Sequence, residues 1–159
     1  MAIDISHTYP ATPDAVLALL TDEQFLRDRA AALGAQVQEA TAAGATTTTR
    51  LSAPTTGIPP VFARFVGTSV SVSERSAWTP DGAGGHRSDL DVTSEVFGRQ
   101  VRVTGERRLV PDGEGTRSTV TGDVTVDAPL IGRQAEGAVR ELMAVVLRKE
   151  DELLRRRLA

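Results

Sequence analysis

The stretch TGDVTVDAPLIGRQAEGAVRELMAVVLRKEDELL, residues 121–154, decides the fold. It begins with the alternating apolar and polar residues of a β-strand and continues, beyond Pro129 and Gly132, with apolar residues at helical spacing. The apolar positions of the helical part are Ile131, Ala135, Ala138, Val139, Leu142, Val145, Val146 and Leu153. A helix of about 25 residues is about 38 Å long at 1.5 Å per residue. It therefore needs an extended apolar surface to cover.

The residues before this helix predict that surface. A strand at 2–9 precedes two short helices, which we expect to begin at Thr12 with Pro13 and at Asp22. From residue 35 onward, apolar residues alternate with polar ones in six further segments: 35–41, 46–53, 67–78, 87–97, 100–110 and 117–128. The connections PDGAGG and PDGEG favour hairpins. We therefore expect an α+β fold, with a seven-stranded antiparallel sheet and the long C-terminal helix across one face.

One segment interrupts this pattern. PTTGIPPVFARF, residues 54–65, contains a pair of prolines, which excludes a central strand. Its apolar residues predict a loop or a single helical turn.

Composition excludes several classes of function. The formal net charge of −3 argues against a nucleic-acid partner, which would favour a basic domain. No cysteine is present and the two histidines lie far apart, so we expect no metal site and no cofactor. The chain begins without a basic leader or a long apolar run, which predicts a cytoplasmic protein without integral membrane contact. In the C-terminal tail, Glu150, Asp151 and Glu152 balance much of the basic charge.

Several segments carry a resemblance to a known family. ATPDAVLALLTDEQFLRDRAAALGA, IPPVFARFVG, SERSAW, and GDVTVDAPLIG followed by a glutamate-bearing helix are similar to a bacterial START-like family of unknown function. That family lies in the START-type, birch-pollen-allergen-like (SRPBCC) superfamily. The resemblance implies the helix-grip fold, in which a curved sheet wraps around one C-terminal helix. It also implies a single ligand-binding domain at 1–159, with a cavity for an apolar molecule between sheet and helix and with no assigned catalytic residue.

The inward faces of the strands predict such a cavity independently. Their side chains are small, aromatic residues make up only 4% of the chain, and Gly105 and Gly122 lie in mid-strand. Because native interiors rarely leave large voids, a ligand is expected to occupy the space under the helix. In the alternative, Phe25, Phe62 and Phe65 fill the space together with the helix, and the two glycines only allow the sheet to bend.

The residues on these inward strand faces and on the apolar face of the helix are the predicted ligand contacts: His7, Tyr9, Val72, Glu74, Leu90, Val92, Val103, Arg107, Val120, Ala138 and Leu142. A buried charge is costly unless it is paired, so Glu74 and Arg107 would form a mutual salt bridge or hold the polar end of a ligand. Alternatively, both lie at strand ends and reach solvent. His7 could shuttle a proton or be a hydrogen-bonded core residue. Tyr9 could donate a hydrogen bond from its hydroxyl to the ligand or only cap the strand end.

Three functions fit this pattern. The first is a protein that carries or sequesters a hydrophobic small molecule, lipid-like or polyketide-like. The second is an enzyme similar to the polyketide cyclases and aromatases of the superfamily, with a histidine, tyrosine or glutamate as general acid or base. The third is an interaction protein with a filled core. Because one fold hosts many functions, the fold does not favour an enzyme over a binding protein.

Overall fold

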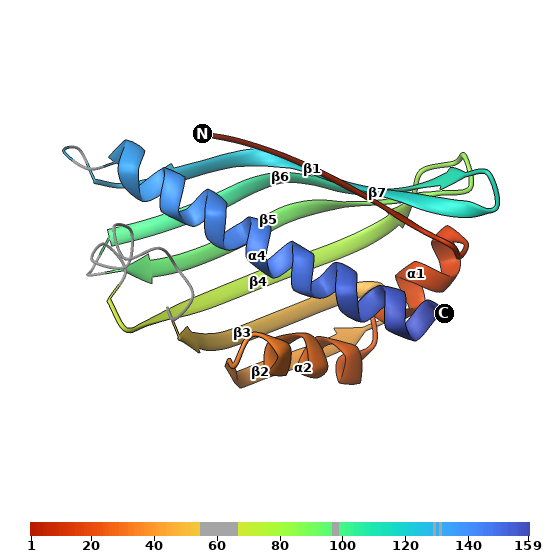
Figure 1. The fold of residues 1–159 in the computed structure, drawn as a ribbon, viewed down its shortest axis with the longest axis horizontal. Helices are drawn as coiled ribbons and strands as arrows, with labels where there is room; N and C mark the ends of the chain where they lie inside the picture. Colours follow the sequence, from red (N-terminus) through yellow and green to blue (C-terminus); the bar gives the residue numbers. More distant parts are fainter. Residues whose placement is uncertain (55–66, 97–98, 129, 131) are drawn as a thin grey trace.

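The computed structural model describes residues 1–54, 67–96, 99–128, 130 and 132–159. Within them, seven strands form one antiparallel sheet in the order β1-β7-β6-β5-β4-β3-β2 (Figure 1). The strands are β1 (Ala2–Tyr9), β2 (Gln36–Ala43), β3 (Thr46–Pro54), β4 (Ser69–Pro80), β5 (His86–Val96), β6 (Arg99–Asp112) and β7 (Gly115–Val126). From β2 to β7, consecutive strands pair with each other, and β1 pairs with β7. The predicted sheet is confirmed.

The helices lie where the sequence predicts them: α1 (Pro13–Leu20), α2 (Glu23–Ala32) and α4 (Gly132–Leu158). At the start of α1, the hydroxyl of Thr12 accepts a hydrogen bond from the backbone N–H of Ala15 at 3.3 Å. Asp22 holds the N-cap position of α2, although its side chain makes no capping hydrogen bond. Beyond Pro54, the predicted loop or helical turn in 54–65 lies outside the described residues.

Helix α4 crosses one face of the sheet diagonally and ends beside α1 (Figure 1). Its backbone approaches β7 and β1 most closely and also lies near α1 and α2. Helix α2 packs against the edge strand β2. This arrangement is the helix-grip architecture, in which α4 crosses the sheet and its backbone lies closer to β7 and β1 than to the other strands.

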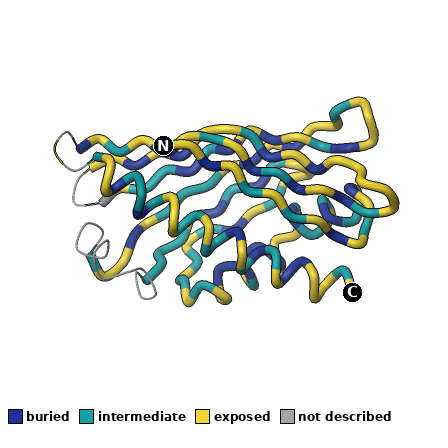
Figure 2. Tube along the Cα trace, turned by 45° about the horizontal axis from the view of Figure 1, so that its top comes forward, coloured by how far each residue is buried: buried dark blue, intermediate teal, exposed yellow. Residues whose placement is uncertain are grey.

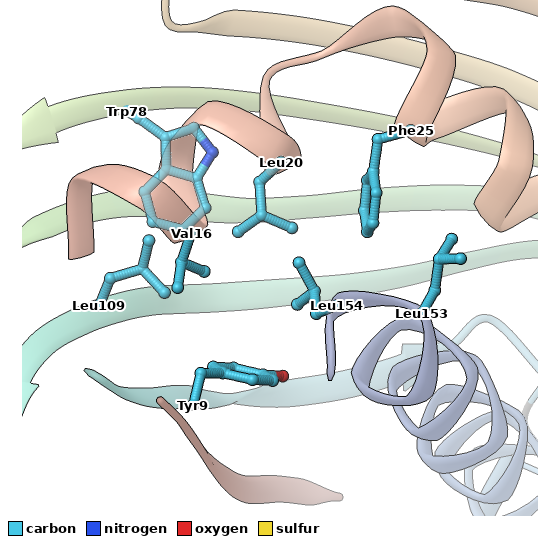
Figure 3. Close-up of a cluster of buried hydrophobic side chains, with 8 residues drawn as sticks. All are labelled: Tyr9, Val16, Leu20, Phe25, Trp78, Leu109, Leu153 and Leu154. Atoms are coloured by element: carbon cyan, nitrogen blue, oxygen red, sulfur yellow. The ribbon is translucent and has the colours of Figure 1, made fainter. Parts of the chain in front are cut away.

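Two apolar clusters hold the helix against the sheet. The first lies where α1 meets the end of α4 and contains Tyr9, Val16, Leu20, Phe25, Trp78, Leu109, Leu153 and Leu154 (Figure 3). The second lies between α4 and strands β1, β5, β6 and β7, and contains Ile3, Leu90, Val92, Val103, Val120, Val124 and Leu147. Buried and exposed positions alternate along the strands (Figure 2). Full burial of one such side chain contributes about 1.5–3 kcal/mol.

A pair of glycines lies at a point of close backbone approach between β6 and β7. Gly105 of β6 and Gly122 of β7 lie opposite each other in the strand register. A Cβ atom on Gly105 would overlap the carbonyl oxygen of Thr121 and the Cα of Gly122, and one on Gly122 would overlap the carbonyl oxygen of Thr104. The backbones of the two strands thus approach more closely than a side chain permits. Whether the two glycines also allow the sheet to bend, as the alternative drawn from the sequence has it, stays a prediction.

We expect Gly105→Ala to destabilise the protein by about 1–3 kcal/mol or more, because the added methyl group forces two paired backbones apart. Urea unfolding measures this change. Gly137→Ala is the matched control. Gly137 lies within α4, and an added Cβ would meet only the end of the Met1 side chain, at 3.9 Å. This control should stabilise the protein by up to about 1 kcal/mol. Equal stability of Gly105→Ala and the wild type would contradict the close backbone approach.

Candidate functional site

A cavity of about 380 Å³ lies between the sheet and helices α2 and α4. Strands β3, β4, β5 and β6 form its floor, and its walls are mainly valine, leucine and alanine side chains. The strand register orders these residues along the cavity. Val70 and Val101 lie toward one end, and Glu74 and Arg107 lie toward the other. The cavity is therefore apolar along most of its length and charged at the end near α1.

The structure brings together seven of the eleven predicted contact residues. Those that line the cavity are Val72, Glu74, Leu90, Val92, Val103, Arg107 and Leu142. Whether they contact a ligand stays a prediction.

The other four, His7, Tyr9, Val120 and Ala138, are not among the cavity-lining residues. Tyr9 and Val120 pack in the two apolar clusters, Ala138 is buried on α4, and His7 is half-buried on β1. The physical reason is the position of α4. Because the helix lies closest to β1 and β7, side chains of these strands pack against it, and the open space lies over β3 to β6.

Three large aromatic side chains of the described residues gather away from the cavity. Tyr9, Phe25 and Trp78 all belong to the first apolar cluster, beneath α1 (Figure 3). Phe25 therefore does not fill the cavity, in contrast to the alternative drawn from the sequence. Phe62 and Phe65, the other residues of that alternative, lie outside the described residues.

A buried network of charges closes one end of the cavity. Glu150 of α4 accepts hydrogen bonds from Nη1 of Arg29 at 2.7 Å and from Nη2 of Arg107 at 2.5 Å. The side chains of Glu150, Arg107 and Arg29 are only 3%, 5% and 7% exposed. Nη2 of Arg29 also lies 3.5 Å from Oε2 of Glu74, whose side chain is 19% exposed. One carboxylate thus joins α2, α4 and β6, and Glu74 extends the network to β4.

This network corrects the interpretation of Glu74 and Arg107. Both point inward as predicted, and Arg107 is buried rather than solvated at a strand end. They are linked through Arg29 and Glu150, however, instead of forming a mutual salt bridge. A direct pair would have satisfied both charges within the sheet. The actual network places the central carboxylate on the helix.

Arg29 and Glu150 are the site residues that the sequence analysis missed. Glu150 was counted with the acidic residues that balance the basic tail, yet it is buried. Its position held a signal, because it lies four residues after Val146 and three before Leu153, on the apolar side of the helix. Arg29 likewise follows the buried Leu26 by three residues. Helical spacing could have placed both on buried faces, but not next to each other.

The arginines determine the ionisation of Glu150. Burial alone would raise the pKa of this carboxyl, but the charges and hydrogen bonds of Arg107 and Arg29 outweigh it and lower the pKa to about 2. For Arg29, burial would lower the pKa, and the carboxylates of Glu74 and Glu150 outweigh this effect and raise it. All three buried groups are therefore charged at neutral pH.

Arg107 retains unused hydrogen-bonding capacity. Its guanidinium lies over the Trp78 ring, 5.7 Å from the ring centroid, a geometry that favours a cation. The Nε atom is buried and has no hydrogen-bond partner among the described residues. Buried donors without a partner are rare in folded proteins, because the missing hydrogen bond costs free energy.

Comparison with known proteins shows the family. The model of the family described as "Protein of unknown function (DUF2505)" matches residues 4–158, so the chain belongs to this family. No curated protein sequence matches the chain.

Solved structures share the fold at low sequence identity. TTHA0849 from Thermus thermophilus is 22% identical, with a TM-score of 0.62 and 97% of both chains covered. The Zhui aromatase/cyclase from Streptomyces sp. R1128 is 15% identical, with a TM-score of 0.62 over 97% of this chain and 90% of that chain. A STAR-related lipid transfer protein from Xanthomonas axonopodis is 17% identical, with a TM-score of 0.61 over 97% and 85%. These likenesses establish the START-like helix-grip fold.

Two further properties concern the described part of the chain only. It contains no group of three or more histidine, cysteine, aspartate or glutamate residues arranged to hold a metal ion. None of its helices combines the length and the apolar character that crossing a membrane requires. The cytoplasmic location stays a prediction.

We expect Glu150→Gln to destabilise the protein by about 3–5 kcal/mol, because it leaves two buried guanidinium groups without their shared anion. Denaturant unfolding at neutral pH measures the loss. Glu152→Gln is the matched control on the same helix, because its side chain is 49% exposed and pairs only with Lys149 at 3.7 Å. The control should change the stability by less than about 0.5 kcal/mol. Similar stabilities for the two variants would show that the network contributes little.

The network also predicts a pH dependence. In the folded protein the pKa of Glu150 is about 2, below its ordinary value of 4.5, so the unfolded chain binds the proton more tightly. The stabilisation is therefore present above about pH 4.5 and is lost as the pH falls toward about 2. Urea midpoints measured from neutral pH down to about pH 3 should fall more steeply for the wild type than for Glu150→Gln. Parallel curves would contradict this assignment.

Proposed function

We propose that the protein binds a hydrophobic small molecule, lipid-like or polyketide-like, in the cavity between the sheet and α4. In this proposal residues 1–159 act as a single ligand-binding domain. The aliphatic side chains of β4, β5, β6 and α4 supply the affinity, and the charged end of the cavity orients the ligand.

The observation that carries the proposal is the cavity itself. Its volume of about 380 Å³ falls within the range of about 300–1,000 Å³ that is usual for small-molecule sites. Native cores are packed about as densely as organic crystals, so a void of this size is exceptional unless something fills it. A mainly aliphatic lining holds water poorly, which favours an apolar occupant.

The comparisons support the same class of ligand. Proteins with this fold include one described as a STAR-related lipid transfer protein and one described as an aromatase/cyclase. Another is described as a putative protein of the dynemicin biosynthetic locus. These proteins share the fold with this chain at 14–17% sequence identity, which is too low to identify a ligand. A hydrophobic small molecule is the chemistry common to the first two descriptions.

An enzyme of the cyclase or aromatase type is the second candidate. General acid–base catalysis works best when the pKa of the catalytic group lies near the working pH. The pKa of Glu150 is about 2, and no histidine is found among the described residues that line the cavity. These observations favour binding over acid–base chemistry. If the enzyme hypothesis holds, Glu74→Gln should abolish turnover of an added polyketide, whereas binding alone predicts only a change in affinity.

An interaction protein with a filled core is the third hypothesis, and the cavity argues against it. In the described structure the aromatic side chains of Phe25 and Trp78 lie outside the cavity lining. The cavity volume of about 380 Å³, which Phe25 would have helped to fill, remains open.

Native mass spectrometry tests the proposed function directly. Protein purified without denaturation should carry one apolar molecule per chain, and unfolding should release this extra mass. Protein refolded without ligand should then bind the neutral fluorophore prodan with a blue-shifted emission. A spectrum with the bare chain mass, together with no prodan binding, would refute the proposal.

A cavity-filling variant identifies the site of binding. Val146 of α4 lines the cavity, and Val146→Trp should weaken prodan binding by at least about tenfold, or about 1.4 kcal/mol, because the indole occupies the space. Ala144→Trp is the matched control, since Ala144 lies on the same helix but is exposed. Its affinity should stay within about twofold of the wild type. Equal losses in the two variants would place the fluorophore elsewhere.

A further inference from the structure

We infer that the cavity takes an apolar molecule that carries a carboxylate, with the carboxylate seated at the Arg107 end. This inference rests on the proposed function and adds to it the chemical class of the ligand. Three features of the described residues carry it: an unused buried donor, an excess of positive charge and the polarity of the two ends of the cavity.

The unused donor is Nε of Arg107. The residue is 4% exposed and lines the cavity, and this nitrogen has no partner among the described residues. Nη2 of the same guanidinium already donates to Glu150, so the group is held in place before any ligand enters. A carboxylate beside this cavity-lining guanidinium could supply the acceptor that Nε lacks among the described residues. Hydrogen bonds from guanidinium groups to carboxylates are among the stronger ones in proteins.

The charges around the cavity favour an anion. The charged residues that line it are Arg29, Arg107, Arg148, Lys149, Glu74 and Glu150. These are four cations and two carboxylates, whereas the chain as a whole has a formal charge of −3. A positive cavity in an acidic protein attracts an anionic ligand.

Arg148 and Lys149 extend the positive charge toward solvent. Arg148 is exposed and can meet an approaching carboxylate before it reaches the interior, whereas Lys149 is half-buried and also pairs with Glu152 at 3.7 Å. The two buried arginines lie deeper, against Glu150. The cations therefore line the cavity from its exposed side to its closed end.

The two ends of the cavity fix the orientation of such a ligand. Val70, Val101 and Val139 line one end, while Glu74, Arg107 and the network line the other. Beyond Arg107 lie Trp78 and the first apolar cluster, which close that end. A hydrocarbon portion fits along the valines, and a carboxylate fits against Arg107.

Glu74 has a distinct effect in this arrangement. It is the partly exposed member of the network, 3.5 Å from Arg29, and its negative charge opposes that of a bound carboxylate. Removal of this charge should therefore strengthen the binding of an acid, whereas removal of the Arg107 charge should weaken it. The opposite signs separate electrostatic recognition from a general loss of structure.

The test compares dodecanoate with its methyl ester, which keeps the chain and the carbonyl but removes the charge. Each displaces prodan from protein that has been freed of ligand, at pH 8 and below its solubility limit. We expect dodecanoate to bind the wild type at least about tenfold more tightly than the ester. Arg107→Met should reduce this ratio to near one, and Glu74→Gln should raise it by several fold.

Arg108→Met is the matched control for Arg107→Met. Arg108 is the next residue of β6, and its side chain is 52% exposed and pairs with Glu106. This variant should keep the wild-type ratio. If Arg107→Met fails to fold, the increase expected for Glu74→Gln still decides the question.

The outcomes also separate the two proposals. Equal affinities for acid and ester in the wild type, or a lower ratio in Glu74→Gln, would overturn the carboxylate inference and leave the hydrophobic site intact. If neither prodan nor either ligand binds, both proposals fail together. A tenfold preference that Arg108→Met abolishes as fully as Arg107→Met would place the carboxylate outside the cavity and would also overturn the inference.

Discussion

The carboxylate of Glu150, held between Arg29 and Arg107, is the interaction on which the arrangement of the helices depends. It joins α4 to α2 and to β6 at a place that water scarcely reaches. A buried ion pair is not the most stable way to fill a core, because desolvation offsets much of the attraction between the charges. Once formed, however, it is strongly directional. The network therefore fixes how α4 lies on the sheet more narrowly than apolar packing alone would.

The position of α4 divides the inner face of the sheet into two halves. Over β1 and β7 the helix lies close, and its side chains complete an apolar cluster with theirs. Over β3 to β6 the helix stands farther away, and a cavity of about 380 Å³ remains. Gly105 of β6 and Gly122 of β7 approach each other closely between these regions. Among the described residues, Tyr9, Phe25 and Trp78 support this division, since they fill one end of the interior and do not line the cavity.

The charged network and the cavity are physically connected. Arg107 contributes to both, because it lines the cavity while one nitrogen of its guanidinium holds Glu150 and another is buried without a partner among the described residues. A structural salt bridge would normally satisfy all of its polar atoms. The unsatisfied nitrogen and the surplus of cations in the cavity lining are the observations on which the proposed role of the network toward a ligand rests.

The sequence by itself determined the order of the elements, the inward faces of the strands and the glycine pair, because periods of 2 and 3.6 residues and the chemistry of turns are local properties. It also indicated that Glu74 and Arg107 face inward. Only the tertiary structure decided that Arg29 and Glu150 complete the network, since the way α4 packs on the sheet brings a residue of α4 against a residue of α2. That packing also removed His7, Tyr9, Val120 and Ala138 from the cavity lining. Local periodicity assigns a residue to a face, whereas the packing of distant elements decides which residues on that face meet.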